Sequence, residues 1–391
     1  MEHISVLIKE VEQGLGLKEG DTVVDATLGL GGHSKIILEK IGKTGKLIAF
    51  EQDEDNLKEA KRRLQDFEKQ IVYIPDNFRN LKIRLIENKI EEVDKIFFDL
   101  GICSTHVDIG ERGFSFMKDA NLDMRFNRNT GVTASDVVNF YDTERLAKIF
   151  REYGEEKSAW RIANAIVDRR KEKVFDSTTD LAEFIKSVYP KVRLKVHPAT
   201  KVFQALRIEV NDELNALKEA LQGAFEMLRE GGIIAVLAYH SLEDRIVKKF
   251  FKELENPAPK LSEQIFRTHG EPKVQKVFNK PLTPSDTELS QNPRSRSAKL
   301  RAYIKLSKGI FPLILKSKLQ IKTFLKNMVL FGGFLYLFGV LRVLPLLLGF
   351  IPRNKGQRAI QSILWSEKIK FWFGKWKFWI GSSMINAHLR V

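Results

Sequence analysis

Residues 22–34 read TVVDATLGLGGHS, and this stretch decides the fold class. The β-branched run at 22–26 predicts a buried strand that ends in an acid and a small residue. A glycine-rich loop follows, and a helical pattern begins at Ser34. Glycine lets backbone N–H groups approach a ligand closely, and the start of a helix favours an anionic group. A strand, a glycine loop and a helix in this order are typical of a nucleotide-binding α/β unit.

The pattern of strands and helices continues along the chain from this unit. The sequence predicts four further buried strands, at residues 46–50, 71–74, 93–100 and 233–238, with helical segments between most of them. A long helix is predicted over 205–229, ended by the pair Gly231-Gly232, and the alternating residues 299–305 predict a closing edge strand. Strands that alternate with helices indicate an α/β fold with a parallel, doubly wound, Rossmann-like sheet.

The region after Gly101 has a different character. From about residue 107 to residue 204 the sequence is polar, and helices are predicted there at 144–153, 158–171 and 179–189. The sheet pattern resumes only afterwards, so a helical insertion interrupts the sheet. We therefore predict four parts, which are the first part of the core at 1–105, an inserted helical substrate domain at 106–205, the second part of the core at 206–305, and a tail at 306–391.

The formal net charge of +15 over 391 residues is concentrated at one end of the chain. From Lys305 onward there are 15 lysines and arginines and one acid, Glu367, whereas the first 304 residues have a net charge of +1. The near-neutral body lacks the strong positive field expected of a non-specific RNA binder. The charge is therefore a property of the tail and does not identify the substrate of the body.

The tail contains an apolar segment, residues 328–352, with a single charge at Arg342. Its 25 residues are enough to span a bilayer, although an arginine is unfavourable there and Pro345 interrupts the helix. Basic and aromatic residues alternate at 368–381, as in an interfacial membrane segment or an RNA-binding segment. We consider three interpretations, a membrane anchor, an RNA-binding extension and the product of a shifted reading frame, and we favour the last.

Composition limits the remaining possibilities. The single cysteine, Cys103, excludes a disulfide framework and a multi-thiolate metal site. Glu155, Glu156 and His197 match no known ligand spacing, so we expect no metal site. The first ten residues contain acids and no apolar region, so they do not form a secretory signal. We expect a cytoplasmic protein, with membrane association only through the tail.

The glycine loop and the next strand together indicate a nucleotide-type cofactor. Glu51 follows the strand at 46–50, 20 residues beyond Gly31, where this fold places an acid that binds ribose hydroxyls. The loop matches neither the G-x-G-x-x-G pattern nor a P-loop. These features leave two candidates, a nicotinamide dinucleotide and S-adenosylmethionine.

The strand at 93–100 favours the second candidate. It ends around Asp99 and leads into a turn of small residues, at the sheet edge where ligands of this fold bind. Methyl transfer to an exocyclic amine needs an acceptor for the amine proton, and Asp99 suits that role as a catalytic residue. A dehydrogenase would need a proton-relay histidine or tyrosine paired with a base, and no such signature stands out. The alternative for Asp99 is a structural cap at the end of the strand.

Seven segments together resemble the RsmH/MraW family of small-subunit ribosomal RNA methyltransferases, over about residues 3–305. They are DATLGLGGHS (25–34), DLGICSTHVD (99–108), RGFSFMKDANLDMRF (112–126), YGEEKSAWRIA (153–163), HPATKVFQALRIEVN (197–211), YHSLEDRIVKKFF (239–251) and NPRSRSAKLR (292–301). Since the family ends near Lys305, the tail is an atypical extension. The resemblance implies a class I S-adenosylmethionine-dependent methyltransferase fold with an inserted helical domain. It also implies methylation of N4 of cytidine 1402 in the decoding centre of 16S rRNA, with naked RNA or the assembled small subunit as the partner.

The resemblance also implies roles for individual residues. Those expected to contact the cofactor are Gly31, Gly32 and His33 beside the methionine part, Glu51 at the ribose, Phe78 at the adenine, Asp99 at the adenine or the reacting centre, and His106. The sequence departs from the usual family pattern at three places, with Glu51 for aspartate, Cys103 for serine, and Thr105-His106 for Pro-Gln. A glutamate can bind the same two hydroxyl groups, but an imidazole cannot present the paired donor and acceptor of an amide.

Residues 112–126 mix arginines, aspartates and three phenylalanines, which suits the clamping of a flipped base and its phosphates. The residues expected to bind the substrate are Arg112, Phe114, Phe116 and Arg125 from this segment, and His240 and Arg245 after the strand at 233–238. Taken alone, the phenylalanines would be core residues and His240 a structural histidine. A short basic run suits phosphate contact or a solvated surface, and it comprises Arg294, Arg296, Lys299 and Arg301.

Two other classes of function share some of these features. A nicotinamide-dependent oxidoreductase would have the same glycine loop and ribose acid, and it would bind NAD instead of S-adenosylmethionine. A non-enzymatic, membrane-tethered RNA-binding factor would use the tail and would transfer no methyl group.

Overall fold

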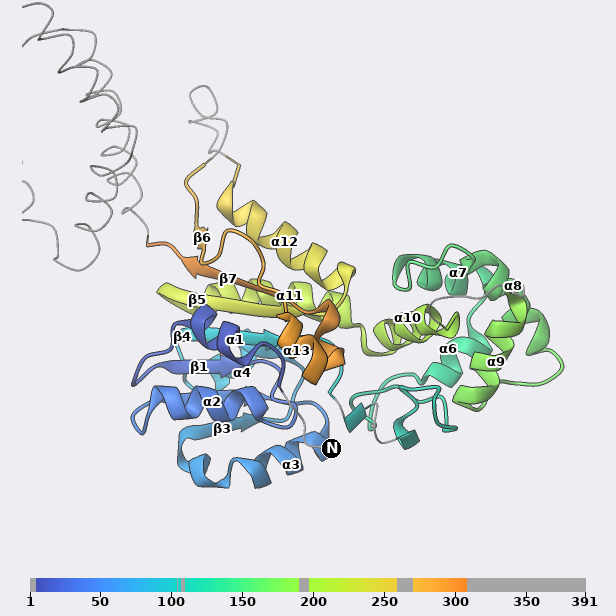
Figure 1. The fold of residues 1–391 in the computed structure, drawn as a ribbon, viewed down its shortest axis with the longest axis horizontal. Coiled ribbons are helices and arrows are strands. Elements are labelled where there is room, and N and C mark those ends of the chain that lie inside the picture. Colours follow the sequence, from blue (N-terminus) through green and yellow to red (C-terminus); the bar gives the residue numbers. More distant parts are fainter. Residues whose placement is uncertain (1–4, 104, 107–109, 190–196, 259–269, 308–391) are drawn as a thin grey trace, which may run out of the picture. The chain divides into compact units, whose positions relative to one another are not determined.

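The computed structural model describes residues 5–103, 105–106, 110–189, 197–258 and 270–307. The tail from residue 308 onward, with the segment at 328–352 and its three interpretations, lies outside the described residues (Figure 1). In the part of the chain that is described, no helix is both long and apolar enough to cross a membrane.

The described residues form a seven-stranded sheet (Figure 1). Its strands are β1 (Thr22–Asp25), β2 (Lys46–Phe50), β3 (Ile71–Ile74), β4 (Val93–Asp99), β5 (Leu228–Ala238), β6 (Val274–Lys276) and β7 (Lys299–Lys305). Their order is β3-β2-β1-β4-β5-β7-β6, with the first five strands parallel to one another and β7 antiparallel to both β5 and β6. This is a Rossmann-like sheet of the class I methyltransferase type, so the predicted fold class is confirmed.

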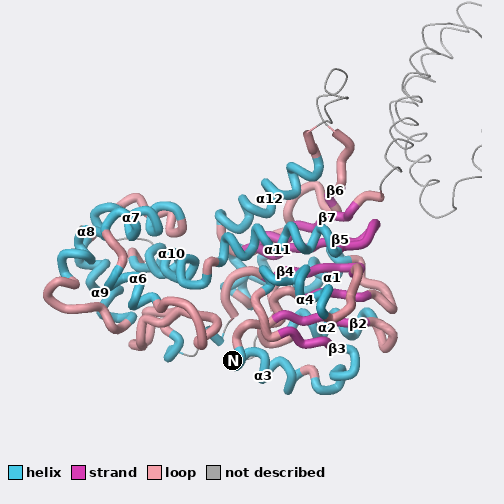
Figure 2. Tube along the Cα trace, turned by 180° about the vertical axis from the view of Figure 1, so that it is seen from behind, coloured by secondary structure: helices cyan, strands magenta, loops and turns pink. Residues whose placement is uncertain are grey.

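Helices cover both faces of the sheet (Figure 2). The helices that accompany the sheet are α1 (Ile8–Leu15), α2 (Gly32–Ile41), α3 (Glu54–Arg63), α4 (Leu81–Glu87), α11 (Glu213–Met227), α12 (Ser241–Glu255) and α13 (Asp286–Gln291). Neighbouring residues of a strand point to opposite faces. Phe97 of β4 therefore packs in the core with α1, α2 and α3, whereas Phe98 packs with α4, α11 and α12. Burial on both faces explains the nearly continuous apolar runs of the central strands.

A helical region with its own hydrophobic core lies between β4 and β5 in the sequence (Figure 2). Its helices are α6 (Ala134–Phe140), α7 (Thr143–Glu152), α8 (Ala159–Arg169), α9 (Thr178–Val188) and α10 (Ala199–Asn211). Phe150, Phe175 and Leu206 are fully buried in this core. The separate core supports the predicted division into a sheet core and an inserted domain, which stays a proposal.

The single helix predicted over 205–229 is wrong, because the chain is interrupted at Asp212 between α10 and α11. Asp212 has φ +48°, a left-handed conformation that ends one helix and redirects the chain. Its carboxylate also forms an ion pair with Arg79 at 2.6 Å. Gly231, which was expected to break the helix, instead lies inside β5. The boundary proposed at residue 205 therefore falls within α10.

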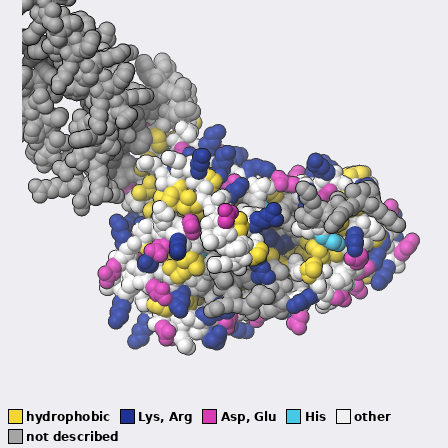
Figure 3. All heavy atoms as spheres, viewed as in Figure 1, with side chains coloured by type: hydrophobic (Ala, Val, Ile, Leu, Met, Phe, Trp, Pro, Cys, Tyr) yellow, Lys and Arg dark blue, Asp and Glu magenta, His cyan; other side chains and the backbone are white. Residues whose placement is uncertain are grey.

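The surface of the described chain reflects the near-neutral charge of the body. Basic and acidic side chains are interspersed over the face shown in Figure 3. Several form exposed ion pairs, such as Lys82 with Glu226 at 2.6 Å and Lys40 with Glu12 at 2.7 Å. The described body therefore has no strong electric field of a single sign.

Candidate active site

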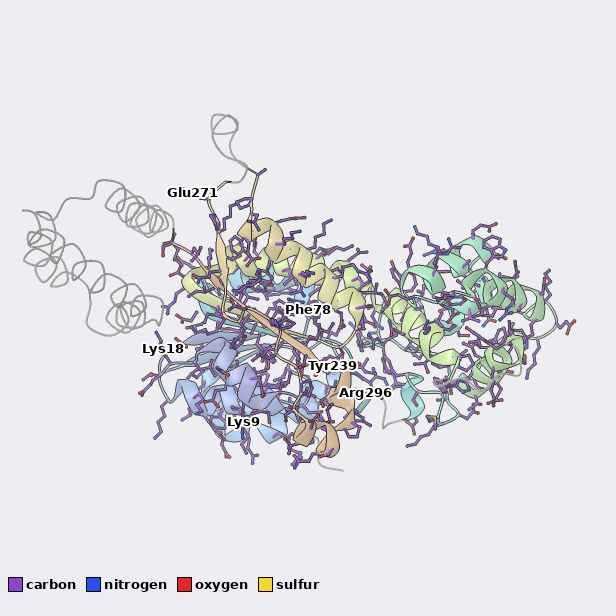
Figure 4. All side chains as sticks on the ribbon, turned by 45° about the horizontal axis from the view of Figure 1, so that its top comes forward. Lys9, Lys18, Phe78, Tyr239, Glu271 and Arg296 are labelled. Carbon is purple, nitrogen blue, oxygen red and sulfur yellow. The ribbon has the colours of Figure 1, made fainter. Side chains whose placement is uncertain are left out.

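A cavity of about 470 Å³ lies at the carboxyl ends of β1, β2, β4 and β5. Its wall includes Gly32 and His33 after β1, Glu51 after β2, Asp99 at the end of β4, and Tyr239 after β5. Phe78, which Figure 4 labels together with Tyr239, also lines it. The topology brings these side chains together because the carboxyl ends of parallel strands share one edge of the sheet.

The glycine loop turns the chain sharply between β1 and α2. Gly31 has φ +81°, a conformation that other residues rarely adopt, and a Cβ atom on Gly32 would clash with the hydroxyl group of Ser5. Gly32 is part of the cavity wall, and so is Gly29. Gly31, which was expected to contact the cofactor, is not part of the wall. In this structure its positive φ sets the direction of the loop.

Asp25, at the end of β1, forms hydrogen bonds that hold this loop against the sheet. One carboxyl oxygen accepts a hydrogen bond from the Thr27 N–H at 3.0 Å, and the other accepts one from the Ser34 hydroxyl at 2.7 Å. Asp25 is buried, and burial raises the pKa of its carboxyl group. The acid that ends the first strand therefore holds the loop in place, which sequence patterning did not predict.

Glu51 presents a half-buried side chain to the cavity. Its Oε1 accepts a hydrogen bond from the Asp53 N–H at 2.8 Å, and its Oε2 accepts one from the Gly29 N–H at 2.9 Å. Burial, together with the charges of Asp53 and Asp25, raises the pKa of Glu51 to about 8. A ligand that offers hydroxyl donors or a positive charge would favour the ionised form of this group.

Asp99 is held by residues that follow two neighbouring strands, β1 and β5, and by a residue of α2. The Tyr239 hydroxyl donates to its Oδ1 at 2.8 Å, its backbone N–H donates to the Thr27 hydroxyl oxygen at 2.6 Å, and its Oδ2 lies 3.5 Å from His33 Nε2. Burial, with the charges of Asp25 and Glu243, raises the pKa of Asp99 to about 7. Asp99 therefore changes charge close to neutral pH.

Tyr239 is a site residue that the sequence reading missed. It directly follows β5, and β5 pairs with β4 so that Leu237 lies opposite Asp99. The signal was present, because a side chain that follows a predicted central strand lies at the same sheet edge as the acid that ends its neighbour. His240, one residue later, is the residue of this segment that the sequence predicted at the site.

His106 lines the cavity, but both of its ring nitrogens are used within the protein. Nδ1 accepts a hydrogen bond from the Cys103 N–H at 3.2 Å, so the proton lies on Nε2, which donates to Asp53 Oδ2 at 2.9 Å. The ring packs between Phe114 and Phe126, with centroid distances of 4.8 Å and 5.0 Å. Burial lowers the pKa of His106 and keeps it neutral. Both ring nitrogens are therefore engaged within the protein, and the contact between His106 and the cofactor that the resemblance implies stays a prediction.

The structure places Arg112 and Phe114 in the interior of the described chain. Their exposed fractions are 6% and 9%, and the contacts expected between these two residues and the substrate stay predictions. Arg112 forms an ion pair with Asp53 at 2.6 Å. Phe114 stacks on Phe126 with a centroid distance of 5.4 Å. The physical reason is that the guanidinium has a buried carboxylate partner and the ring has aromatic neighbours.

The other residues predicted to bind the substrate have different degrees of access. Phe116 packs against His197 and Phe203, and Arg125 pairs with Asp123 at 2.8 Å. His240 caps α12 through the Glu243 N–H and also lines the cavity. Arg245 is 65% exposed and pairs with Glu155 at 3.0 Å. Their contacts with a substrate stay predictions.

Comparison with known proteins assigns the chain to a family. The sequence profile of the MraW methylase family matches residues 1–306. The chain belongs to this family. Ribosomal RNA small subunit methyltransferase H of Streptococcus mutans is 47% identical over 308 residues, which cover 78% of this chain and 98% of the relative. The protein of the same name from Clostridium botulinum is 46% identical over 306 residues, which cover 78% and 99%.

A solved rRNA methylase structure from Streptococcus thermophilus has a TM-score of 0.36 and 13% identity, and the match covers 78% of this chain and all of that one. At this level the structural likeness adds nothing to the family assignment. Membership of the MraW methylase family rests on the sequence match over the described body.

The cavity suits the methyl donor that such a methylase requires. Glu51 and Asp99 bring two half-buried carboxyl groups to the cavity wall, after β2 and at the end of β4. S-Adenosylmethionine carries a sulfonium, an ammonium and two ribose hydroxyls, and all of these favour carboxylate partners. In the described part of the chain, no cluster of three or more histidine, cysteine or acidic side chains could hold a metal ion.

Proposed function

We propose that this chain is an S-adenosylmethionine-dependent methyltransferase that acts on small-subunit ribosomal RNA, and that its acceptor is the exocyclic N4 of cytidine 1402 in 16S rRNA. The observation that carries the proposal is the shared cavity. Glu51 after β2 and Asp99 on β4 line the same space on either side of β1. This arrangement supports a division of roles, in which Glu51 would hold the cofactor and Asp99 would face the group that reacts.

Different residues of the cavity wall suit different parts of S-adenosylmethionine. Gly32 and His33 would hold the methionine part, Glu51 would bind the ribose hydroxyls, and Phe78 would pack on the adenine. Phe78 is braced by an edge contact with Phe98, at a centroid distance of 5.9 Å. When bound, the cofactor supplies a methyl group activated by a sulfonium.

Asp99 would act on the acceptor amine. The exocyclic amine of cytosine is a poor nucleophile, because its lone pair is delocalised into the ring. A carboxylate that accepts a hydrogen bond from this amine orients the nitrogen and stabilises the positive charge that develops on it. Tyr239 holds Oδ1 of Asp99 and thereby fixes the direction of the group. The protein would contribute orientation and exclusion of water, without a covalent intermediate.

The catalytic role of Asp99 is tested by Asp99→Ala. We expect methyl transfer to fall by roughly 10²- to 10⁴-fold, because the variant lacks the proton acceptor, while the affinity for S-adenosylhomocysteine changes little. Single-turnover rates and calorimetric titration measure the two quantities separately. Near-normal turnover with unchanged cofactor affinity would show that the role assigned to Asp99 is wrong.

The inserted helices α6 to α10 are proposed as the substrate domain, and the substrate is either naked RNA or the assembled subunit. The family assignment favours methyl transfer over a nicotinamide-dependent oxidoreductase, and paired titrations with NAD and S-adenosylhomocysteine check this choice. Transfer of a labelled methyl group to small-subunit RNA would exclude a non-enzymatic RNA-binding factor.

A further inference from the structure

We infer that Arg112 is a positioning residue for the ribose of the cofactor, and that it acts on Glu51 through Asp53. The inference rests on the proposed function, in which Glu51 binds the ribose hydroxyls. It gives Arg112 a role different from the phosphate contact that its sequence context suggested.

Arg112 is fixed by protein groups on both sides of its guanidinium. Nη1 lies 2.6 Å from Asp53 Oδ2, and Nη2 donates to the carbonyl oxygens of Arg125 at 2.9 Å and Phe126 at 3.1 Å. Arg112 and Asp53 are only 6% and 2% exposed. Since the pair is shielded from solvent and held by several bonds, its geometry is well defined.

Asp53 connects this ion pair to the backbone at the start of α3. Its Oδ1 caps α3 by accepting hydrogen bonds from the N–H groups of Asp55 at 2.9 Å and Asn56 at 3.2 Å, while Oδ2 receives Arg112 and His106. Burial alone would raise the pKa of Asp53, but the hydrogen bond from His106 and the charge of Arg112 lower it to about 2. The carboxylate therefore stays ionised and keeps Asp53 in one position.

The backbone of Asp53 in turn orients Glu51. The Asp53 N–H donates to Glu51 Oε1 at 2.8 Å, which is one of the two bonds that hold this carboxyl group at the cavity wall. A glutamate side chain has several rotatable bonds. A carboxylate that is already held in one orientation therefore loses less conformational entropy when a ligand binds than a freely rotating one does. The chain of contacts runs from Arg112 to Asp53 and from Asp53 to Glu51, and it ends where the ribose is expected.

The inference predicts a loss of affinity that depends on the ribose hydroxyls. We expect Arg112→Met to weaken S-adenosylhomocysteine binding roughly tenfold, and to weaken binding of its 2′-deoxy analogue much less, because the analogue makes less use of Glu51. Arg112→Lys keeps a cation beside Asp53 and should restore part of the difference. Calorimetric titration of both ligands against each variant measures it.

The matched control is Arg169→Met, which removes another partly buried arginine–aspartate pair, with Asp180 at 2.6 Å, that has no contact with Glu51. This variant should bind both ligands like the unmodified chain. Equal weakening of the two ligands by Arg112→Met would mean that Arg112 only supports the fold, and no weakening would remove its role altogether. Either result overturns the inference.

A second variant covers the case in which Arg112→Met does not fold. Asp53→Asn keeps an oxygen that can cap α3 but removes the charge that pairs with Arg112. We expect the same selective loss of affinity for S-adenosylhomocysteine relative to its 2′-deoxy analogue. If the two ligands are weakened equally or not at all, the inference is contradicted. If the unmodified chain bound neither ligand, the proposed function would fail instead, so the two failures are distinguishable.

Discussion

The three carboxyl groups of Asp25, Glu51 and Asp99 lie at the ends of neighbouring parallel strands, and burial raises the pKa of each. Without a ligand, ionisation at this edge is unfavourable because like charges are close and water is partly excluded. A cationic, hydroxyl-bearing ligand relieves this cost. At the residue scale, cofactor affinity is therefore linked to the proton content of the site.

This linkage predicts the pH dependence of cofactor binding. With a pKa of about 8, Glu51 is mostly protonated in the free protein at pH 6 and mostly ionised at pH 9. Hydroxyl donors favour the ionised form, so binding releases a proton, and the affinity for S-adenosylhomocysteine should rise roughly tenfold or more between pH 6 and pH 8. Titrations across this range should show a much smaller dependence for Glu51→Gln. A dissociation constant of the unmodified chain that does not vary with pH would contradict the prediction.

At the element scale, the strands were the most predictable part of the molecule. β2, β3 and β7 begin and end where the apolar and alternating runs at 46–50, 71–74 and 299–305 do. The prediction failed at Asp212, because a left-handed residue between two helices leaves no apolar pattern behind. It also failed at Gly231, because β5 continues through an irregular stretch at residues 229–232, where the register with β4 shifts and glycine can adopt the positive φ of +78°.

The candidate site was predictable where strand ends define it. Glu51 and Asp99 could be placed because the topology of a parallel sheet determines which edge they occupy. The network of His106 and Arg112 with Asp53 was not predictable, because it joins residues more than 50 positions apart through side-chain geometry. Nothing in the local sequence distinguishes an arginine that binds a phosphate group from an arginine that pairs with a buried aspartate.

At the scale of the whole molecule, the near-neutral body must attract RNA through local basic groups. Arg301 and Lys299 pair with Asp244, at 2.7 Å and 3.7 Å, so they are engaged within the fold. Arg294 lines the cavity, and Arg296 is exposed in the same turn (Figure 4). In the proposed function, this turn provides phosphate contacts near the reacting base.

Arg296→Ala should therefore weaken binding of small-subunit RNA and lower the dependence of log affinity on log salt by roughly 0.7, as expected for the loss of one contact to a single strand. The matched control is Lys18→Ala, an exposed cation before β1 and hence at the opposite edge of the sheet. Filter binding at several salt concentrations measures both slopes. Equal slopes for the two variants would contradict a phosphate contact at Arg296.

The central claim is methylation of a cytidine amine in small-subunit RNA. The measurement that tests it most directly is transfer of a labelled methyl group from S-adenosylmethionine to unmodified small-subunit RNA and to assembled subunits, followed by nucleoside mass spectrometry and mapping of the labelled position. We predict that the label is found in N4-methylcytidine at position 1402 and disappears with Asp99→Ala. Label in a different nucleoside, or no transfer to either substrate by a chain that binds the cofactor, would contradict the claim.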